Sequence, residues 1–160
     1  MKKACFAGSF DPFTNGHLDV VKKCSELFDI VYIMIGVNVR KSRHIPADAM
    51  KTAIEGTLKR LNLENCVVCI HDGLLVDFLK NNDIKYMARG LRSALDFEYE
   101  ENMARVNKLL YEDIEYIYIR ADTDVFSALS SSMVRELKNF GKDISEYVPK
   151  ETLEVYKEIQ

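Results

Sequence analysis

Short apolar runs alternate with amphipathic segments along the chain, and this alternation limits the possible folds more than any other feature of the sequence. Each apolar run is nearly continuous, which is typical of strands that are buried on both faces of a parallel sheet. The runs predict strands over residues 3–7, 30–37, 67–71, 85–88 and 115–119.

The segments between these strands carry apolar residues at helical spacing. We interpret the resulting stripes as helix faces that pack into the core, and not as cofactor-binding surfaces. Pro149 indicates a last helix with proline in its first turn. Strands that alternate with helices predict an α/β protein with a doubly wound parallel sheet. The stripes comprise Leu18, Val21, Cys24 and Phe28; Ala53, Leu58 and Leu61; Leu75, Phe78 and Leu79; and Leu95, Tyr99, Met103 and Val106.

The length and composition predict one domain over residues 1–160, because domains usually contain about 100–150 residues. Hydrophobic residues at 48% and charged residues at 29% exclude a disordered chain. The net charge of -3 argues against binding of nucleic acid through a broad basic surface. The longest apolar run, residues 30–37, is far shorter than the roughly 20 residues of a membrane span, so we expect no membrane partner.

The four cysteines indicate neither a disulfide framework nor a metal site. The chain carries no recognisable secretion signal, so we expect reduced thiols and a cytoplasmic location. Cys66 and Cys69 lie three residues apart in a predicted strand, where their side chains point to opposite faces. The two sulfurs therefore cannot share one metal ion, and no second pair completes a set of four ligands.

The loop after the first strand, residues 7–17, is the richest candidate binding segment. Ligands of doubly wound sheets bind beyond the carboxyl ends of the strands, where the strand order reverses. Gly8 lets the backbone approach a ligand, and Ser9 offers a hydroxyl group. His17 lies in the first turn of the next helix, where free N–H groups and the helix dipole favour phosphate. The alternative is that His17 only caps the helix or packs against it.

Two further segments offer donors for phosphate. Arg89 and Arg92 follow the fourth strand, and their guanidinium groups suit phosphate oxygens. Residues 130–132 are three serines that open a predicted helix, where hydroxyl and free N–H groups form an anion site. Exposed surface arginines and a simple serine N-cap are the alternative interpretations.

These segments resemble the signature of the nucleotidyltransferase superfamily, whose TxGH element binds the nucleotide triphosphate. Within it, the order and spacing are similar to those of one family, the bacterial phosphopantetheine adenylyltransferases, over nearly the whole chain. The resemblance implies a Rossmann-like fold, a homohexamer, and transfer of an adenylyl group from ATP to 4'-phosphopantetheine. The products would be dephospho-coenzyme A and pyrophosphate, in coenzyme A biosynthesis. The matching segments are residues 8–12, 14–17, 38–41, 89–92, 96–100 and 130–135.

The same resemblance implies a role for individual residues. His17 would stabilise the transition state through the α-phosphate, and Ser9 and Lys41 would hold the reacting phosphates without acting as covalent nucleophiles. The acceptor would contact Ser9, Lys41, Leu75 and Arg89. ATP would contact Ser9, Phe10, His17, Gly90, Leu91, Arg92, Glu100, Phe126, Ser127, Ala128, Leu129, Ser130, Ser131 and Ser132.

The chemistry of such a transfer asks for positioning more than for acid–base groups. A phosphate monoester has a second pKa of about 6, so at pH 7 it is largely a dianion and needs no strong general base. In-line attack on the α-phosphorus then depends on orientation and on neutralisation of charge. We expect Mg2+ to arrive with ATP, because the chain shows no dedicated metal cage built from its own side chains.

Two departures from the family pattern affect the substrate sites. Residues 42–50 differ from the usual helix start after Lys41, and Ala128 stands where a bulkier aromatic residue is common. Two other functions remain open at this stage: nucleotidyl transfer to another phosphorylated small molecule, and nucleotide binding by a non-catalytic regulator. The combination of Lys41, Arg89 and Arg92 favours the phosphopantetheine acceptor over another phosphorylated molecule.

Overall fold

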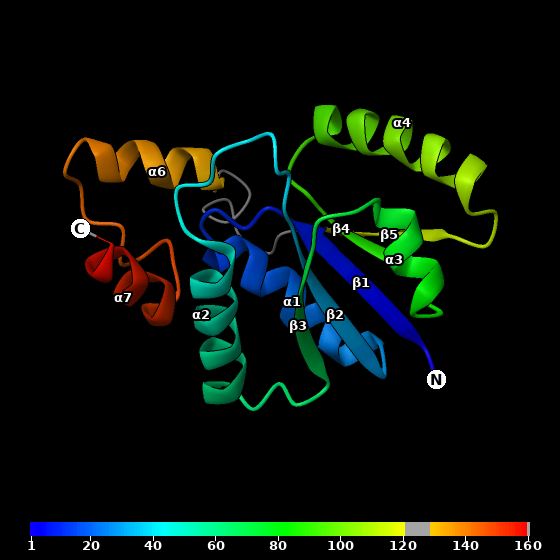
Figure 1. Ribbon diagram of the computed structural model, residues 1–160, viewed down its shortest axis with the longest axis horizontal. Coiled ribbons are helices and arrows are strands. Elements are labelled where there is room, and N and C mark those ends of the chain that lie inside the picture. Colours follow the sequence, from blue (N-terminus) through cyan, green and yellow to red (C-terminus); the bar gives the residue numbers. More distant parts are fainter. Residues whose placement is uncertain (121–128, 160) are drawn as a thin grey trace.

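The computed structural model describes residues 1–120 and 129–159 and contains a five-stranded parallel sheet with helices packed against it (Figure 1). The fold is α/β with a Rossmann-like, doubly wound sheet, as the sequence predicts. All five predicted strands are present, and only their ends shift by a few residues. The strands are β1 (Lys3–Gly8), β2 (Ile30–Gly36), β3 (Cys66–His71), β4 (Tyr86–Leu91) and β5 (Glu115–Arg120).

The strand order is β3-β2-β1-β4-β5, so the order reverses between β1 and β4. β1 pairs with β2 along its whole length, over residues 3–8. Its pairing with β4 is shorter and covers residues 4–6. The reversal places the carboxyl ends of β1 and β4 beside one crevice, which is where doubly wound sheets bind their ligands.

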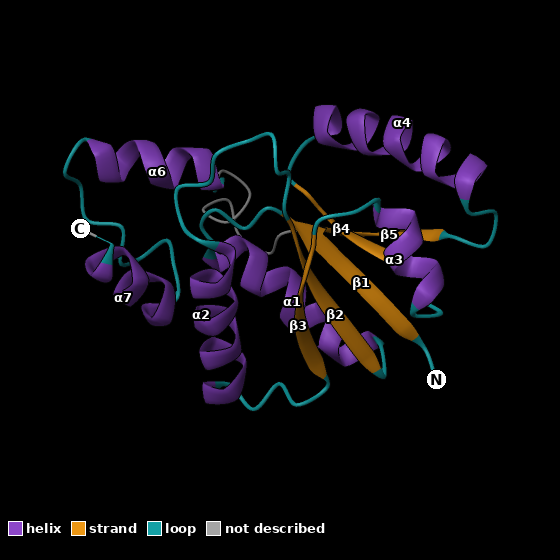
Figure 2. Ribbon diagram, in the orientation of Figure 1, coloured by secondary structure: helices purple, strands orange, loops and turns teal. Residues whose placement is uncertain are grey.

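The sheet divides the core into two clusters, and helices cover both of its faces (Figure 2). The helices are α1 (Asn15–Leu27), α2 (Ala47–Arg60), α3 (Leu75–Asn81), α4 (Ala94–Leu110), α6 (Ser131–Asn139) and α7 (Lys150–Glu158). The larger cluster includes Val21 from α1, Ile54 from α2 and Val134 from α6. The smaller cluster lies on the opposite face and includes Leu79 from α3. The apolar stripes of α1, α2 and α3 therefore pack into the core as predicted.

The prediction of a core stripe was wrong for α4. No residue of this helix is buried, and Leu95, Tyr99, Met103 and Val106 leave 77%, 66%, 43% and 52% of their surface exposed. The stripe has the helical spacing that the sequence indicates, but it faces away from the core of this chain.

Polar contacts attach α4 to the sheet in place of apolar ones. Asn107 Nδ2 donates to the hydroxyl of Tyr116 at 2.7 Å, and the hydroxyl of Tyr118 donates to Glu101 at 2.5 Å. A helix whose sheet-facing side is polar leaves its apolar side directed outward, and helical spacing alone does not distinguish the two orientations.

The cysteines agree with the sequence analysis. All four are free thiols. Cys66 packs against the larger cluster and Cys69 against the smaller one, so the two sulfurs lie on opposite faces of the sheet. Burial raises the pKa of each of these two thiols to about 11, which keeps both protonated and poorly reactive at pH 7.

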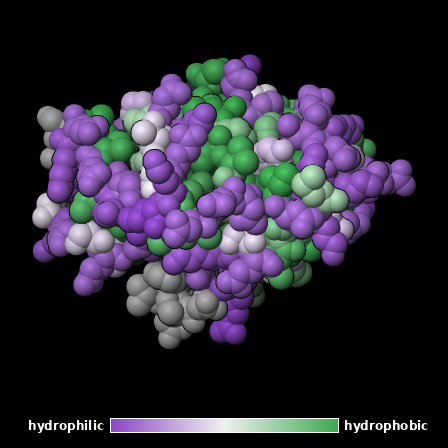
Figure 3. Space-filling model, turned by 90° about the horizontal axis from the view of Figure 1, so that it is seen from below, coloured by the Kyte–Doolittle hydropathy of each residue, from purple (hydrophilic) through white to green (hydrophobic). Residues whose placement is uncertain are grey.

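The surface in view in Figure 3 is mostly polar, with apolar side chains in smaller groups between hydrophilic ones. Within the two described ranges, no helix is both long enough and apolar enough to cross a membrane.

Candidate active site

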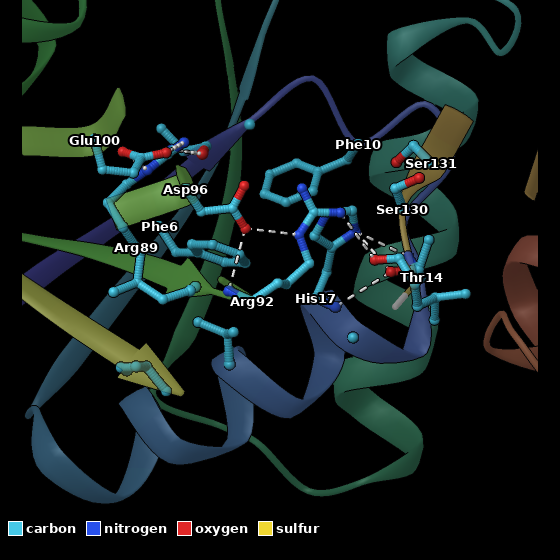
Figure 4. Close-up of a pocket in the computed structure, with 18 of the residues that line it drawn as sticks. Phe6, Phe10, Thr14, His17, Arg89, Arg92, Asp96, Glu100, Ser130 and Ser131 are labelled. Carbon is cyan, nitrogen blue, oxygen red and sulfur yellow. Dashed lines mark hydrogen bonds and ion pairs between the residues drawn. The ribbon is translucent and has the colours of Figure 1, made fainter. Parts of the chain in front are cut away.

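A pocket of about 370 Å³ opens at the carboxyl ends of β1 and β4, where the strand order reverses. Its walls come from the loop after β1, the first turns of α1, the start of α4 and the N-terminus of α6 (Figure 4). Segments far apart in the sequence thus meet at one cavity of ligand size, at the place that the sheet topology predicts.

His17 lies in the first turn of α1, and its ring orientation is fixed by Thr14. The Thr14 hydroxyl, as N-cap, accepts from the N–H of His17 at 3.3 Å, and the N–H of Thr14 donates to His17 Nδ1 at 3.0 Å. Because Nδ1 accepts this bond, we assign the proton of the neutral ring to Nε2. His17 therefore caps the helix through one nitrogen and keeps the other as a donor.

The surroundings of His17 keep its ring neutral at pH 7. The rings of Phe10 and Phe13 lie 5.0 and 5.6 Å from the imidazole, centroid to centroid, and leave little room for the water that would solvate a cation, although the ring is partly exposed at the pocket. Burial lowers the pKa of His17 to about 3, and the positive charges of Arg92 and Arg89 act in the same direction. A neutral His17 has an Nε2–H group that can donate a hydrogen bond, and it carries no imidazolium charge.

The loop after β1 adopts a conformation that few residues tolerate. Phe10 has a φ of 44°, which lies in the left-handed region. A Cβ at Gly8 would meet the ring of Phe10 at 3.1 Å, so a side chain at this position would displace that ring. Gly8 therefore makes room for an aromatic ring of its own loop, in addition to lining the pocket.

Arg89 leaves the end of β4 and is held by two partners. Its Nε and Nη2 donate to the two carboxylate oxygens of Glu100 at 2.8 and 2.7 Å, and its Nη1 donates to the carbonyl of Ala7 at 2.6 Å. A guanidinium group carries five N–H donors, so these three bonds leave two for a ligand. Glu100 on α4 thus orients the arginine without using all its donors (Figure 4).

Arg92 is paired with the same helix. Its Nε and its backbone N–H both donate to one oxygen of Asp96 at 3.1 Å, and its Nη1 donates to the carbonyl of Leu129 at 3.4 Å. Asp96 also lines the pocket, and sequence reasoning assigned it no role. The available signal was its position four residues after a candidate phosphate-binding arginine.

The three serines before and at the start of α6 have different partners. Ser130 is the N-cap and accepts from the backbone N–H three residues later at 3.1 Å, as the capping alternative requires. The Ser131 hydroxyl donates to the carbonyl of Pro12 at 2.7 Å, whereas exposed Ser132 bonds to Arg135 at 3.3 Å. Ser130 and Ser131 also line the pocket, so the N-terminus of α6 faces a site where its free N–H groups favour an anion.

The pocket gathers most of the residues that the sequence singled out. Lys41 is exposed in the turn after β2, Leu75 packs against the smaller core cluster, and Ser132 faces solvent, so these three do not line the cavity. Phe126, Ser127 and Ala128 lie outside the described residues. The predicted residues that line it are Ser9, Phe10, His17, Arg89, Gly90, Leu91, Arg92, Glu100, Leu129, Ser130 and Ser131.

Comparison with known proteins agrees with this geometry. Residues 5–137 match the model of a family described as cytidylyltransferase-like. The phosphopantetheine adenylyltransferase of Thermotoga neapolitana is 39% identical over 148 residues, which cover 92% of this chain and 90% of that protein. The phosphopantetheine adenylyltransferase of Streptococcus pneumoniae strain Taiwan19F-14 is 44% identical over 154 residues, which cover 96% and 93%. The chain belongs to the phosphopantetheine adenylyltransferase family.

Solved structures of other nucleotidyltransferases share the fold of this phosphopantetheine adenylyltransferase family member. A putative nicotinate-nucleotide adenylyltransferase from Vibrio parahaemolyticus superposes with a TM-score of 0.67 at 19% identity, covering 97% of this chain and 91% of that one. The nicotinic acid mononucleotide adenylyltransferase of Plasmodium falciparum, complexed with APC, gives a TM-score of 0.72 at 17% identity, covering 99% and 96%. At these identities the likeness shows the fold alone.

Proposed function

We propose that this enzyme transfers the adenylyl group of ATP to 4'-phosphopantetheine and forms dephospho-coenzyme A and pyrophosphate, as a step of coenzyme A biosynthesis. The observation that carries the proposal is the convergence of neutral His17, Arg89 and Arg92 on one pocket. The pocket belongs to a chain that is 39% and 44% identical to two enzymes named for this activity.

In the proposed reaction, an oxygen of the acceptor phosphate attacks the α-phosphorus of ATP in line with the leaving group. One P–O bond forms, the bond between the α-phosphorus and the bridging oxygen breaks, and pyrophosphate leaves with the electron pair. The acceptor phosphate is already largely dianionic at pH 7, so no side chain has to remove a proton. No covalent enzyme intermediate is formed.

His17 supplies the donor for the charge that develops on the α-phosphate. The bond from Thr14 fixes Nδ1, so Nε2–H can point to a phosphate oxygen without reorganisation at the moment of reaction. A hydrogen bond of this kind contributes to catalysis when it is stronger in the transition state than in the ground state.

The remaining phosphate oxygens have separate donors in the proposal. The N-terminus of α6, with Ser130 and Ser131, faces the β- and γ-phosphates, and Arg92 adds a positive charge on the same side. Arg89, with its two remaining donors, and Lys41 would neutralise the acceptor phosphate. Ser9 would lie between the two phosphates as a hydroxyl donor.

Magnesium belongs to the proposal as a companion of ATP. Among the described residues, no group of three or more His, Cys, Asp or Glu side chains is placed to hold a metal ion. A magnesium ion bound through the phosphates of ATP would neutralise the charge that departs with pyrophosphate. We therefore expect activity to require magnesium and to cease in excess chelator.

We also propose that the enzyme is a homohexamer that acts in the cytoplasm. The exposed Leu95, Met103 and Val106 of α4 support assembly, because an apolar helix face is more stable when another surface covers it, whereas Tyr99 of the same stripe lines the pocket. The four free thiols are in keeping with a reducing compartment.

The proposal is tested by incubating the enzyme with ATP, magnesium and a panel of phosphorylated acceptors, and by measuring which acceptor is adenylylated. The panel contains 4'-phosphopantetheine, dephosphorylated pantetheine, nicotinamide mononucleotide and glycerol phosphate. We expect adenylylation of 4'-phosphopantetheine alone. Preference for another phosphorylated acceptor would reassign the substrate, and ATP binding without any transfer would indicate a regulator.

A further inference from the structure

Asp11 is a nearly buried carboxylate that the proposed reaction does not use. Its side chain is 10% exposed, and the residue does not line the pocket. One oxygen accepts from the N–H of Ile45 at 2.9 Å, and the other accepts from the N–H of His44 at 2.9 Å and lies 3.2 Å from His44 Nδ1. All these partners belong to the segment between β2 and α2, which also contains Lys41.

The ionised form of Asp11 is the stable one in the folded chain. Burial alone would raise the pKa of this carboxyl, but the N–H groups of His44 and Ile45 outweigh burial and lower it below the ordinary value. Nearby Arg43 acts in the same direction. The charge is thus retained in a place where only well-aligned donors make a buried charge tolerable.

The backbone around Asp11 makes further ties. The carbonyl of Phe10 accepts from Arg43 Nη2 at 3.4 Å, and the carbonyl of Asp11 accepts from Arg135 Nη1 at 2.6 Å. Residues 10–11 therefore connect the segment after β2 with α6, whose N-terminus faces the pocket. In the proposed function, each of these two segments carries groups that bind a phosphate of a substrate.

Lys41 itself lies in a local turn. The N–H of Lys41 donates to the carbonyl of Asn38 at 2.9 Å, and the N–H of Arg40 donates to the side chain of the same asparagine at 2.9 Å. The segment is anchored before this turn by the N–H of Val37, which donates to the backbone carbonyl of His71 at 2.9 Å. The anchor after the turn is the set of bonds from residues 43–45 to residues 10–11.

We propose that Asp11 is a positioning residue, which holds the segment after β2 so that Lys41 can reach the acceptor phosphate. The proposal rests on the role that the proposed function gives to Lys41. Asp11 touches neither substrate, and its effect on the reaction passes through Lys41. Replacing the carboxylate by an amide puts an NH2 group against one of two backbone N–H donors, which loosens the segment without changing the size of the side chain.

The first test is a double-mutant cycle that combines Asp11→Asn with Lys41→Ala and measures kcat/KM for the acceptor at saturating ATP. We expect Asp11→Asn to lower this value about tenfold, the loss of roughly one hydrogen bond to a charged group, with ATP affinity within about threefold of the parent. In the Lys41→Ala background, Asp11→Asn should have almost no further effect. If the losses of the two single variants multiply in the double variant, the proposal is overturned. Parent-like activity of either single variant would overturn it as well.

Glu151→Gln is the matched control. This carboxylate is 14% exposed, accepts from Thr57 at 2.9 Å and from Arg60 at 2.6 Å, and lies on α7 outside the pocket. Like Asp11, it is a mostly buried carboxylate that accepts several hydrogen bonds. The Glu151→Gln variant therefore reports what a general loss of stability does to activity. We expect kcat/KM within about twofold of the parent for Glu151→Gln. A loss equal to that of Asp11→Asn would reduce Asp11 to a structural role.

Hydrogen exchange gives a readout that does not depend on catalysis. We expect the hydrogen-bonded amides of residues 40, 41, 44 and 45 to exchange at least about tenfold faster in Asp11→Asn than in the parent, with α7 unchanged. Unchanged exchange at these four amides would overturn the proposal even if the acceptor were a different one. An enzyme inactive on 4'-phosphopantetheine would instead contradict the proposed function.

A second variant, His44→Ala, tests the proposal if Asp11→Asn does not fold. The side chain of His44 is 59% exposed, so His44→Ala removes only the ring contact and keeps both backbone donors. We expect a loss of about two- to fivefold in kcat/KM for the acceptor, and this loss should disappear in the Lys41→Ala background. A loss that persists there would overturn the proposal.

Discussion

His17 caps and packs against α1 as one interpretation of the sequence requires, and the structure leaves the other, donation to a phosphate, open as a proposal. Its Nδ1 completes the capping box of α1 with Thr14, and its ring packs between phenylalanines. The packing role does not exclude the chemical one, since both depend on the same neutral tautomer. Capping leaves Nε2–H as the remaining donor, and the aromatic neighbours lower the pKa of the ring.

The first prediction concerns removal of this donor. His17→Ala should lower kcat by about 10²–10³, the usual loss for one transition-state donor, while the Kd for ATP rises far less. The substitution also removes an acceptor from the N-cap, so the melting temperature must be measured alongside. If a folded variant keeps kcat within about threefold of the parent, His17 is a packing residue only.

The second prediction concerns the pH dependence of the same ring. The pKa of His17 is lowered to about 3, so its NMR resonances should not titrate between pH 5 and pH 8. Below pH 6.5 the unfolded chain takes up a proton at this histidine that the folded chain does not, so burial of the neutral ring lowers stability as the pH falls. A titration midpoint near 6.5 would show that the ring is hydrated and that the proposed tautomer is not held.

At the scale of elements, α4 shows where sequence periodicity stops being informative. The stripe from Leu95 to Val106 has the correct spacing for a helix, and the helix is present. Periodicity identifies an apolar face but not the surface that covers it, and here the sheet is met by polar residues. The arginines at the end of β4 are bound by Glu100 and Asp96 on this helix, so α4 shapes the pocket as well.

The third prediction tests whether the outward stripe of α4 is an assembly surface. If the proposed hexamer forms through this stripe, Met103→Glu combined with Val106→Glu should dissociate it at micromolar concentration in sedimentation velocity experiments, because charges would be buried in an apolar interface. The fold should persist, since no residue of α4 is buried within the chain. Leu27→Glu, at an apolar residue of α1 that is 60% exposed, is the control and should leave the mass unchanged. An unchanged mass for the α4 variant would place the interface elsewhere.

At the scale of the whole molecule, the sequence predicted the sheet from local signals, whereas many of the pocket residues were predicted only through the resemblance to a known family. The βα alternation predicts each strand, and the topology then places His17 and Arg89 at one crevice. Contacts between residues that are far apart in the sequence leave no local pattern from which they could be predicted. Asp11 meets its partners 33 and 34 positions along the chain, and only the folded backbone brings them together.

The fourth prediction concerns acid stability. Hydrogen bonds from Arg60 lower the pKa of Glu151 from 4.5 to about 2 and join α2 to α7. Because the folded pKa is the lower one, the stabilisation is complete above about pH 4.5 and is lost as the pH falls towards 2. Glu151→Gln should therefore destabilise the protein in urea unfolding at pH 7, and by less at pH 3.

The control for this prediction is a surface pair. Glu55 lies 3.6 Å from Lys51, and both side chains are exposed, so Glu55→Gln should change stability little at either pH. Equal losses for Glu151→Gln at pH 7 and pH 3 would show that its contribution is not ionic.

The short pairing of β1 with β4 has a consequence for how the protein folds. β1, β2 and β3 join neighbours in sequence, whereas the bond from Arg89 to Ala7 closes 82 positions of chain. Closing a loop of that length costs entropy before any contact repays it, so we expect the two halves of the sheet to meet late. The pocket lies between the two halves, and a nascent chain that ends before β4 holds the TxGH loop without the arginines opposite it. We therefore expect the pocket to be completed only in the step that joins the halves.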